Sequence, residues 1–286
     1  MQHNSQPVRR PNSNLASLLD TTAGNAKAVD KHIWALTLPS LVELMLATLF
    51  GMVDMVMVGH VSTESLAAVG ISNQPMMLIL SVFQALNVGT MALVARFTGT
   101  DDHQSSCSVL KQTLILATLV GTVLSGLGFV YARRIVAFMG AEPEVIPAAA
   151  AYFSVTALGT VFVAVIMGIG AALRGAGDTV TPMRYNLISN LLNVFGNYIL
   201  IFGKLGFPAL GVTGAALSTT LSRGLRMLMA LYAVYRPYSL FRLSTRQTTR
   251  IDIALMKRIL NIGLPSGLEQ LVLRTGQIEF ARTVAG

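Results

Sequence analysis

The sequence predicts an all-α membrane protein that crosses the bilayer several times. Its 286 residues are 53% hydrophobic and 12% charged, whereas an average soluble domain has about 25% charged residues. The mean hydropathy is +0.61. Apolar segments of membrane-crossing length, about 20 residues or more, recur along the chain. These observations exclude water as the main solvent of the protein and make the lipid bilayer its main partner.

The predicted elements follow one another as a tail, six spans, a linker and a further helix. Residues 1–31 are polar and lack the apolar core and cleavage site of a signal peptide, so we interpret them as a cytoplasmic tail. A six-helix transmembrane unit, 32–235, comes next. Its predicted spans are 33–59, 67–97, 108–131, 145–172, 183–203 and 209–235. A basic inter-lobe linker, 236–258, leads to a helix predicted over 259–286.

The lysine and arginine residues predict the orientation. Fourteen of them lie in the tail, in the connections after the second and fourth spans, and in the linker, whereas the opposite connections hold Arg133, Arg134 and Lys204. Positive charge gathers on the cytoplasmic side, so a multi-pass protein of the cell membrane with a cytoplasmic N-terminus is expected. A nucleic-acid binder would cluster its basic residues on one soluble face, so the net charge of +8 does not predict that partner.

An internal repeat indicates a duplicated helix bundle. Residues 36–60 begin LTLPSLVE and residues 262–286 begin IGLPSGLE, which aligns Glu43 with Glu269. Duplicated bundles are a common plan of transporters, with the substrate path between the halves. We therefore expect two parallel six-helix repeats, of which this chain holds the first and the start of the second. The C-terminal lobe would be missing, the chain could not transport alone, and Glu269 is a cavity-lining candidate.

Two carboxylates lie within the first predicted span. Glu43 and Asp54 are eleven residues apart, which places them on one helix face about 16 Å apart along the axis. Carboxylates inside a bilayer are costly and usually face a cavity, an ion path or a partner. Both are candidates for proton or cation coupling, and the alternative is a structural ion pair with an arginine such as Arg223. Pro39 marks either a bend in this helix or its first turn at the membrane edge.

A stripe of amides follows the fifth span. Asn186, Asn190, Asn193 and Asn197 are spaced 4, 3 and 4 residues apart and share a narrow helix face. Asparagine oxygens are ligands for small cations, so the stripe predicts a hydrated cavity. The alternative is hydrogen bonding between helices.

The sixth span carries small, hydroxylated and basic residues. Thr219 is expected to face the amide stripe, while Gly214, Ser218 and Ser222 form a packing ridge. Arg226 is expected to extend to the cytoplasmic surface. For Arg223, this path and a pairing with a carboxylate both stay open.

Enzyme and metal sites are not expected. The chain has one cysteine and four widely separated histidines, so neither a disulfide nor a metal site is predicted. The segment 173–183, LRGAGDTVTPM, contains the Gly-x-Gly-Asp pattern of intramembrane aspartyl proteases. That chemistry needs a second aspartate facing the first, whereas Asp178 is predicted to lie in a cytoplasmic connection. Thr181 and Pro182 are placed there as N-cap and first residue of the next helix.

Several strings together resemble the MATE (multidrug and toxin extrusion) family. They are LRGAGDTVTPM at 173–183, VDMVMVGHVSTESLAAVG at 53–70, NYILIFG at 197–203 and PALGVTGAALST at 208–219. The resemblance implies twelve helices in two lobes around a central cavity. It also implies export of cationic or amphipathic small molecules in exchange for H⁺ or Na⁺, with no other cofactor. A flippase of the same superfamily for a lipid-linked substrate is the alternative.

The resemblance also assigns roles to individual residues. Asp54 matches the acidic residue of the family's first helix, the proposed cation site, and Pro39 matches the proline at which that helix is proposed to bend. Asn193 and Thr219 match an amide and a hydroxyl of the same site. Asn197 stands where archaeal-type members have a second aspartate, which weakens the case for tight Na⁺ binding.

Overall fold

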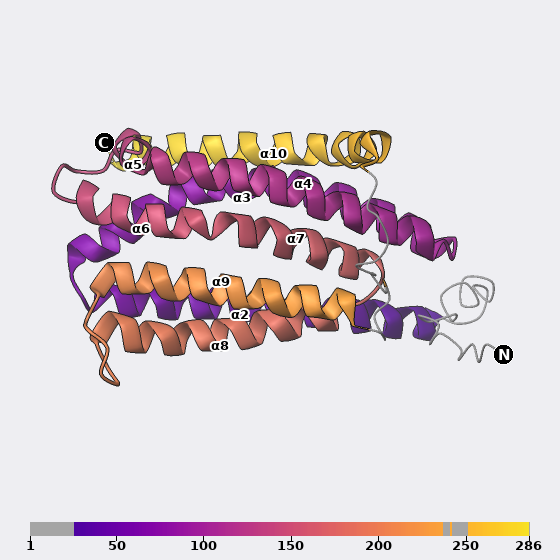
Figure 1. Ribbon diagram of the computed structural model, residues 1–286, viewed down its shortest axis with the longest axis horizontal. Helices are drawn as coiled ribbons and strands as arrows, with labels where there is room; N and C mark the ends of the chain where they lie inside the picture. The colour runs from indigo at the N-terminus through magenta and orange to yellow at the C-terminus, as the bar shows by residue number, and fades with distance from the viewer. Residues whose placement is uncertain (1–25, 237–240, 242–250, 286) are drawn as a thin grey trace.

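The computed structural model describes the backbone of residues 26–236, 241 and 251–285. These residues form long helices joined by short turns (Figure 1), which confirms the all-α prediction. The helices are α2 (Ala26–Gly59), α3 (Thr63–Gly99), α4 (His103–Val130), α5 (Ala132–Phe138), α6 (Ile146–Leu158), α7 (Thr160–Gly175), α8 (Val180–Phe202), α9 (Gly211–Tyr235) and α10 (Ile253–Ala285).

The long helices are arranged in two groups. Helices α2, α8 and α9 pack together in one group, and α3, α4 and α7 pack together in the other, with α6 lying between α9 and the pair α3 and α4. Helix α10 covers the far side of α3 and also touches α4. Both predicted carboxylates and the amide stripe belong to the first group, so the fold brings the polar residues of three helices into one interface.

Helix α10 approaches α3 closely because small residues line its contact face. A Cβ atom at Gly263 would overlap the carbonyl oxygen of Ala85, and one at Gly267 would lie 2.7 Å from the Ala85 Cβ. Glycines four residues apart permit this kind of close helix packing in membranes.

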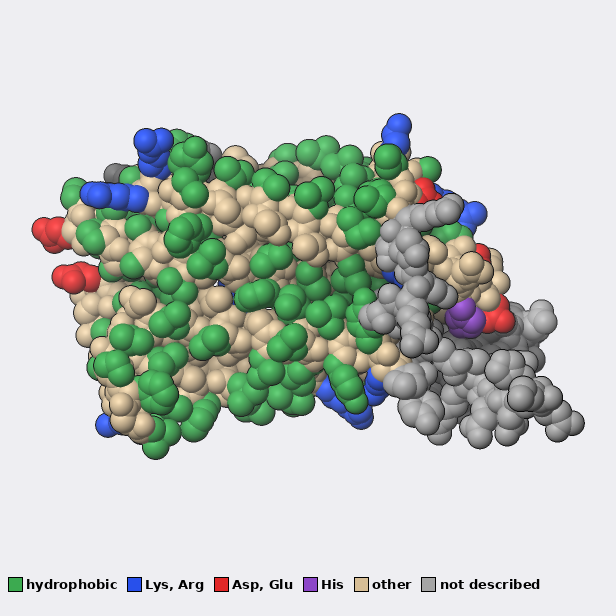
Figure 2. Space-filling model, in the orientation of Figure 1, with side chains coloured by type: hydrophobic (Ala, Val, Ile, Leu, Met, Phe, Trp, Pro, Cys, Tyr) green, Lys and Arg blue, Asp and Glu red, His purple; other side chains and the backbone are tan. Residues whose placement is uncertain are grey.

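The surface is that of a membrane protein. Hydrophobic side chains cover the middle of the face shown in Figure 2, and charged side chains gather toward the two ends. Among the described residues, α2, α3 and α4 are long and apolar enough to cross a bilayer, and the pair α6 and α7 would count as a fourth span. Helix α8 is less apolar because of its four asparagines, and α9 because of its two arginines. These residues face other helices rather than lipid.

The fourth predicted span is interrupted, which the sequence did not predict. Helices α6 and α7 meet at Gly159 with a bend of 44°. The carbonyl oxygens beside the break accept hydrogen bonds from α9: Thr220 Oγ1 donates to Val155 O at 3.1 Å, and Arg223 Nη1 donates to Thr156 O at 3.3 Å. The apolar pattern runs unbroken through 145–172, so nothing in it marked the bend.

Two helices begin earlier in the sequence than the spans predicted for them. Helix α2 begins at Ala26, although its membrane-crossing part, Ile33–Gly59, is the predicted first span. Helix α10 begins at Ile253, inside the predicted linker. The start of α10 follows from Asp252, whose Oδ1 accepts a hydrogen bond from Leu255 N at 2.9 Å. Helix α5 is a short element in a segment that was predicted as a connection.

The turn before α8 explains the Gly-x-Gly-Asp pattern. Asp178 Oδ1 accepts from Thr181 N at 2.9 Å, and Asp178 Oδ2 accepts from Thr181 Oγ1 at 2.6 Å. The prediction of Thr181 as the N-cap was therefore wrong: α8 already begins at Val180, and the Asp178 carboxylate satisfies the free backbone donor. Asp178 has a structural role in a connection between helices.

Candidate functional site

Two carboxylate–amide pairs join α2 to α8. Asn197 Nδ2 donates to Asp54 Oδ1 at 2.8 Å, and Asn186 Nδ2 donates to Glu43 Oε1. We call these contacts the Asp54 pair and the Glu43 pair. Each contact joins residues 143 positions apart in the sequence. The two carboxylates on α2 are therefore eleven residues apart, as are the two asparagines on α8. The prediction that both carboxylates share one face of α2 is confirmed.

A second amide contacts the Asp54 carboxylate. Asn193 is 8% exposed, and one terminal atom of its amide lies 3.0 Å from Asp54 Oδ2. When that atom is nitrogen, it donates to both Asp54 oxygens, and the amide oxygen accepts from Thr219 N at 3.3 Å. In the opposite orientation the nitrogen contacts Ser218 Oγ at 3.3 Å and Thr219 Oγ1 at 3.5 Å. The first orientation gives both amide atoms a suitable partner, so Asn193 is a second donor to the Asp54 carboxylate.

Asn197 contributes a further oxygen to this site. Its side chain is 1% exposed, and its Oδ1 atom has no hydrogen-bond partner among the described residues. A buried polar atom without a partner is costly. The oxygen is therefore available to a cation or a water molecule beside Asp54.

Arg223 lies close to Asp54 without forming a direct ion pair. The two groups interact electrostatically, but the Arg223 guanidinium donates its hydrogen bond to Thr156 O, at 3.3 Å. Of the two alternatives for Arg223, extension to the cytoplasmic surface is wrong, and a direct ion pair with Asp54 is not formed either, although the two charges interact. Tyr152 interacts electrostatically with both groups and was missed from the sequence. The sequence feature that could have indicated it is a single tyrosine directly after the run of four alanines in α6.

The Glu43 pair is surrounded by arginines. Arg174 Nη1 lies 3.9 Å from Glu43 Oε1, and both side chains are largely buried, at 27% and 20% exposure. Arg226 Nη2 donates to Asn190 Oδ1 at 2.6 Å. The prediction that Arg226 extends to the cytoplasmic surface was therefore wrong, because the amide stripe of α8 offers it an acceptor inside the bundle.

The close packing of α8 on α9 positions the amides. A Cβ atom at Gly214 would overlap the Leu200 carbonyl oxygen, and one at Gly196 would lie 2.5 Å from Ser218 Oγ. Ser218 Oγ in turn donates to Asn193 O at 2.9 Å. The predicted packing ridge of α9 is confirmed, and it places Ser218 and Thr219 beside Asn193. The four amides bond to side chains of α2 and α9, and their lining of a hydrated cavity stays a prediction.

Two predicted residues lie apart from these pairs. Glu269 is exposed on α10, which packs against α3 and α4. Pro39 lies inside α2, well after its first residue Ala26, so the alternative that it begins this helix was wrong. Its role as a bending point stays a prediction.

A comparison with family models identifies the chain. The model described as MatE matches residues 39–199, more than half of the sequence. The chain belongs to the MATE family. Members of this family are transporters and not enzymes, so the protease alternative is not supported, and neither is the flippase alternative.

Curated MATE relatives match nearly the whole chain. The "Probable multidrug resistance protein NorM" of Thermotoga maritima is 33% identical over 253 residues, covering 88% of this chain and 54% of the relative. Multidrug resistance protein PmpM of Pseudomonas aeruginosa is 28% identical over 246 residues, covering 83% and 50%. The chain spans about half the length of the curated relatives it matches.

Solved structures of MATE transporters are also matched over about half of their length. The chain is similar to a multidrug resistance MATE family transporter of the MOP superfamily in its outward-facing conformation, with a TM-score of 0.77 and 29% identity. A MOP superfamily transporter from Pyrococcus furiosus gives the same two values. In both comparisons the match covers 84% of this chain and 52% of the other. The described helices thus have the fold of part of a MATE transporter.

Proposed function

We propose that this chain forms the N-terminal lobe of an antiporter that exports cationic or amphipathic small molecules in exchange for H⁺ or Na⁺. The proposal includes a six-helix lobe over 32–235, a linker over 236–258, and a first helix of the second lobe. It also includes a place in the cell membrane with the N-terminus and the linker in the cytoplasm. The observation that carries it is the Asp54 pair, a carboxylate held inside an apolar helix bundle by neutral amides.

Asp54 is the group that takes up the coupling ion. A buried carboxylate without a direct cationic partner is costly, and binding of a cation or a proton removes that cost. The Asn197 Oδ1 atom, the Asn193 amide and Thr219 Oγ1 supply neutral polar atoms around it. When the charge of Asp54 is neutralised, the hydrogen bonds that it accepts from the Asn193 and Asn197 amides weaken.

This change couples ion binding to helix packing. The Asp54 pair is a direct polar link between α2 and α8, so neutralising Asp54 weakens one of the contacts that hold α2 in place. Pro39 lies in the same helix and removes one backbone hydrogen bond, which lowers the cost of bending there. A change in the shape of α2 would alter the cavity face that meets the second lobe, as alternating access requires.

The geometry supports H⁺ better than Na⁺. Arg223 interacts electrostatically with Asp54, and its positive charge opposes a proton and a metal cation alike. Asn197 stands at the position of a second family aspartate, which leaves a single carboxylate for the ion. One carboxylate is enough to bind a proton but gives a metal cation few charged ligands.

The test separates the two ions in vesicles. The complete transporter that contains this lobe is reconstituted, and efflux of a cationic dye is started either by a pH gradient or by a Na⁺ gradient at constant pH. We expect the pH gradient to drive efflux and the Na⁺ gradient to have little effect. Efflux driven by Na⁺ alone would reject H⁺ as the coupling ion, and efflux independent of both gradients would reject the antiporter.

A further inference from the structure

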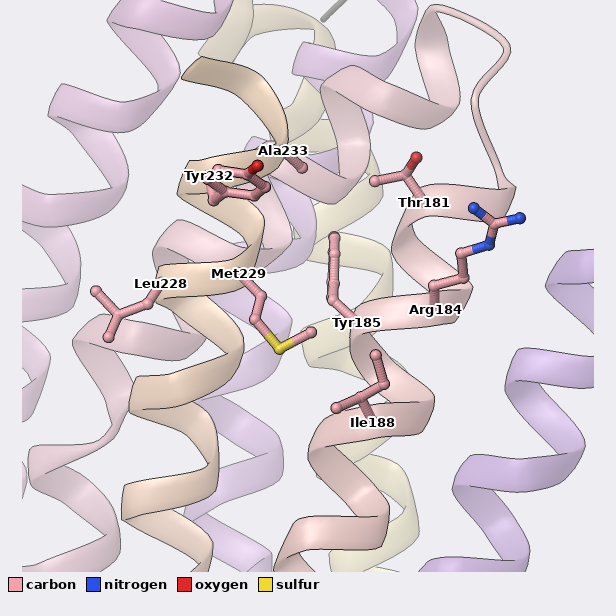
Figure 3. A pocket seen from close by; sticks show the side chains of 8 residues that line it. All are labelled: Thr181, Arg184, Tyr185, Ile188, Leu228, Met229, Tyr232 and Ala233. Carbon is pink, nitrogen blue, oxygen red and sulfur yellow. The ribbon is translucent and has the colours of Figure 1, made fainter. Parts of the chain in front are cut away.

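An elongated pocket lies between α8 and α9 near the end of the bundle where α8 begins and α9 ends. It has a volume of about 340 Å³. Four of its lining residues come from each helix (Figure 3). They are Thr181, Arg184, Tyr185, Ile188, Leu228, Met229, Tyr232 and Ala233.

The wall of this pocket is apolar and open to the membrane. Ile188, Leu228 and Tyr232 line it and are 44%, 59% and 72% exposed, so their outer sides face the lipid chains around the bundle. Because the pocket is open on its outer side, the surrounding lipid chains reach its apolar wall. A lipid acyl chain is the apolar molecule present at high concentration beside this surface.

One end of the pocket is positively charged. The Arg184 side chain extends at the same end as Thr181, whereas Ile188, Leu228 and Met229 lie further along the helices (Figure 3). Arg184 is exposed and makes no ion pair with a carboxylate in the described part of the chain. The nearby Asp178 carboxylate is occupied by Thr181 N and Oγ1.

The end of α9 adds to this positive charge. Arg236 is the C-cap of α9, three residues beyond Ala233, and it is exposed. Tyr232, also at this end, carries a phenol of the kind that gathers at the boundary between lipid chains and headgroups. The pocket therefore combines an apolar wall with a basic, aromatic end.

We propose that the α8–α9 pocket binds one anionic phospholipid, with its phosphate at Arg184 and an acyl chain along Ile188, Leu228 and Met229. Basic pockets between membrane helices on the cytoplasmic side are suited to anionic headgroups. The lipid lies on the side of α8 that faces away from Asn197 of the Asp54 pair. It would stabilise the packing of α8 on α9, and its place on the cytoplasmic side rests on the orientation given in the proposed function.

Lipid titration of the 286-residue chain tests this assignment. The purified protein in detergent is titrated with phosphatidylglycerol and with phosphatidylcholine of the same acyl chains, and bound lipid is counted by native mass spectrometry. We expect one phosphatidylglycerol to bind more tightly than phosphatidylcholine by about fivefold, the factor expected for one basic side chain at an anionic headgroup. Equal binding of the two lipids would overturn the proposal.

Three further measurements locate the site. Arg184→Gln should remove the preference for phosphatidylglycerol, whereas the matched control Lys204→Gln at the opposite end should keep it. Ala233→Phe fills the pocket and should weaken the binding of both lipids. Glycerol phosphate without acyl chains should not compete. An unchanged preference in Arg184→Gln, or full competition by glycerol phosphate, would contradict a lipid site at this pocket.

Discussion

The Asp54 pair and the Glu43 pair have the same construction but different charge surroundings. Each joins a carboxylate of α2 to an asparagine of α8. Glu43 also has Arg174 at 3.9 Å, with Arg226 bound one turn away at Asn190. Asp54 has a second amide, Asn193, beside it, and the nearby Arg223 donates to a backbone carbonyl instead.

This difference assigns different roles to two similar contacts. A carboxylate that already has a cationic partner gains little from binding an ion, so the Glu43 pair acts as a fixed link between α2, α7 and α8. A carboxylate among neutral amides is stabilised by any cation or proton that reaches it. We therefore propose that the Glu43 pair is a structural contact and that the Asp54 pair is the ion site on the same helix face.

The largest expected effect comes from removing the charge of Asp54. Asp54→Asn keeps the size and polarity of the side chain but cannot take up a proton. In the complete transporter we expect gradient-driven dye efflux to fall to the background, while the amount of protein in the membrane stays normal on an immunoblot. Wild-type efflux by this variant would remove Asp54 from the mechanism.

Substituting the matching asparagines sharpens the comparison. Asn197→Ala removes a hydrogen bond to a charged group, which contributes about 1.5–3 kcal/mol, so we expect the concentration of coupling ion needed for half-maximal efflux to change by about 10–100-fold. Asn186→Ala, the equivalent change in the Glu43 pair, should leave this concentration unchanged. An equal change of this ion concentration in both variants would contradict the distinction between the Asp54 pair and the Glu43 pair.

A smaller effect is expected from the ion pair of Glu43. Glu43→Gln and Arg174→Gln should each lower the free energy of unfolding, with a coupling of about 0.5–1 kcal/mol because both groups are partly exposed. A double-mutant cycle measured by unfolding in detergent gives this coupling. A coupling of zero would show that the two charges do not stabilise each other.

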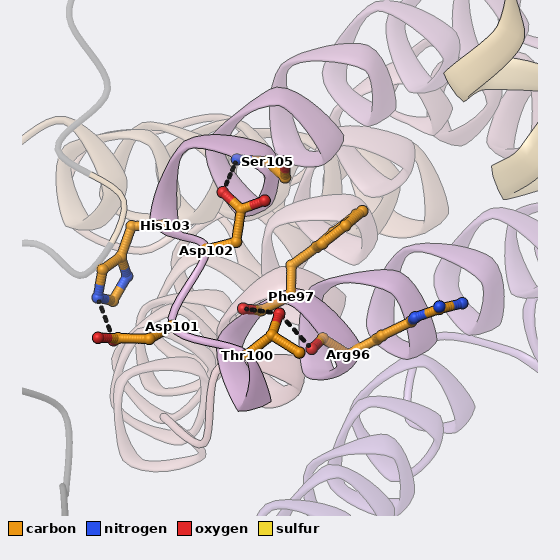
Figure 4. Close-up of polar contacts among 7 residues, drawn as sticks. All are labelled: Arg96, Phe97, Thr100, Asp101, Asp102, His103 and Ser105. Atoms are coloured by element: carbon orange, nitrogen blue, oxygen red, sulfur yellow. Dashed lines mark hydrogen bonds and ion pairs between the residues drawn. The ribbon is translucent and has the colours of Figure 1, made fainter.

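The smallest perturbation tests the orientation. Cys107, the one cysteine of the sequence, is half-buried, and its thiol donates to Phe241 O at 2.6 Å. It is first replaced by serine, so that the only thiol in each variant is the one introduced. A new cysteine is then placed at Thr100, exposed in the turn between α3 and α4 (Figure 4), or at Glu142, exposed at the other end of the bundle. In intact cells an impermeant thiol reagent should label Glu142→Cys and miss Thr100→Cys. The reverse result would invert the topology.

The helix pattern and part of the site could be predicted from the sequence. Long apolar runs locate the membrane helices because the bilayer fixes their length. The spacing of Glu43 and Asp54 predicted one shared face because an α-helix repeats regularly. The amide stripe of α8 was predicted in the same way, with Thr219 beside it, although the partners of Asn186, Asn190 and Asn197 were not.

The remaining contacts depend on how helices pack against one another. The bend at Gly159 lies in an apolar run, and the carbonyls beside it accept hydrogen bonds from α9, which follows much later in the sequence. Arg226 was predicted to reach the surface because its neighbour Asn190 belongs to another helix. Tyr152 joins the Asp54 site for the same reason. Periodicity gives the face of a helix, but not the helix that this face meets.

The pH dependence of efflux tests the central claim, that Asp54 binds the coupling ion and Glu43 does not. Efflux by the complete transporter in vesicles is measured over a range of pH for the wild type, Asp54→Asn and Glu43→Gln, with the protein amounts matched. We predict that Glu43→Gln keeps the midpoint of the wild-type pH profile, whereas Asp54→Asn shows no pH-dependent efflux. A wild-type profile in Asp54→Asn together with a flat profile in Glu43→Gln would contradict the account.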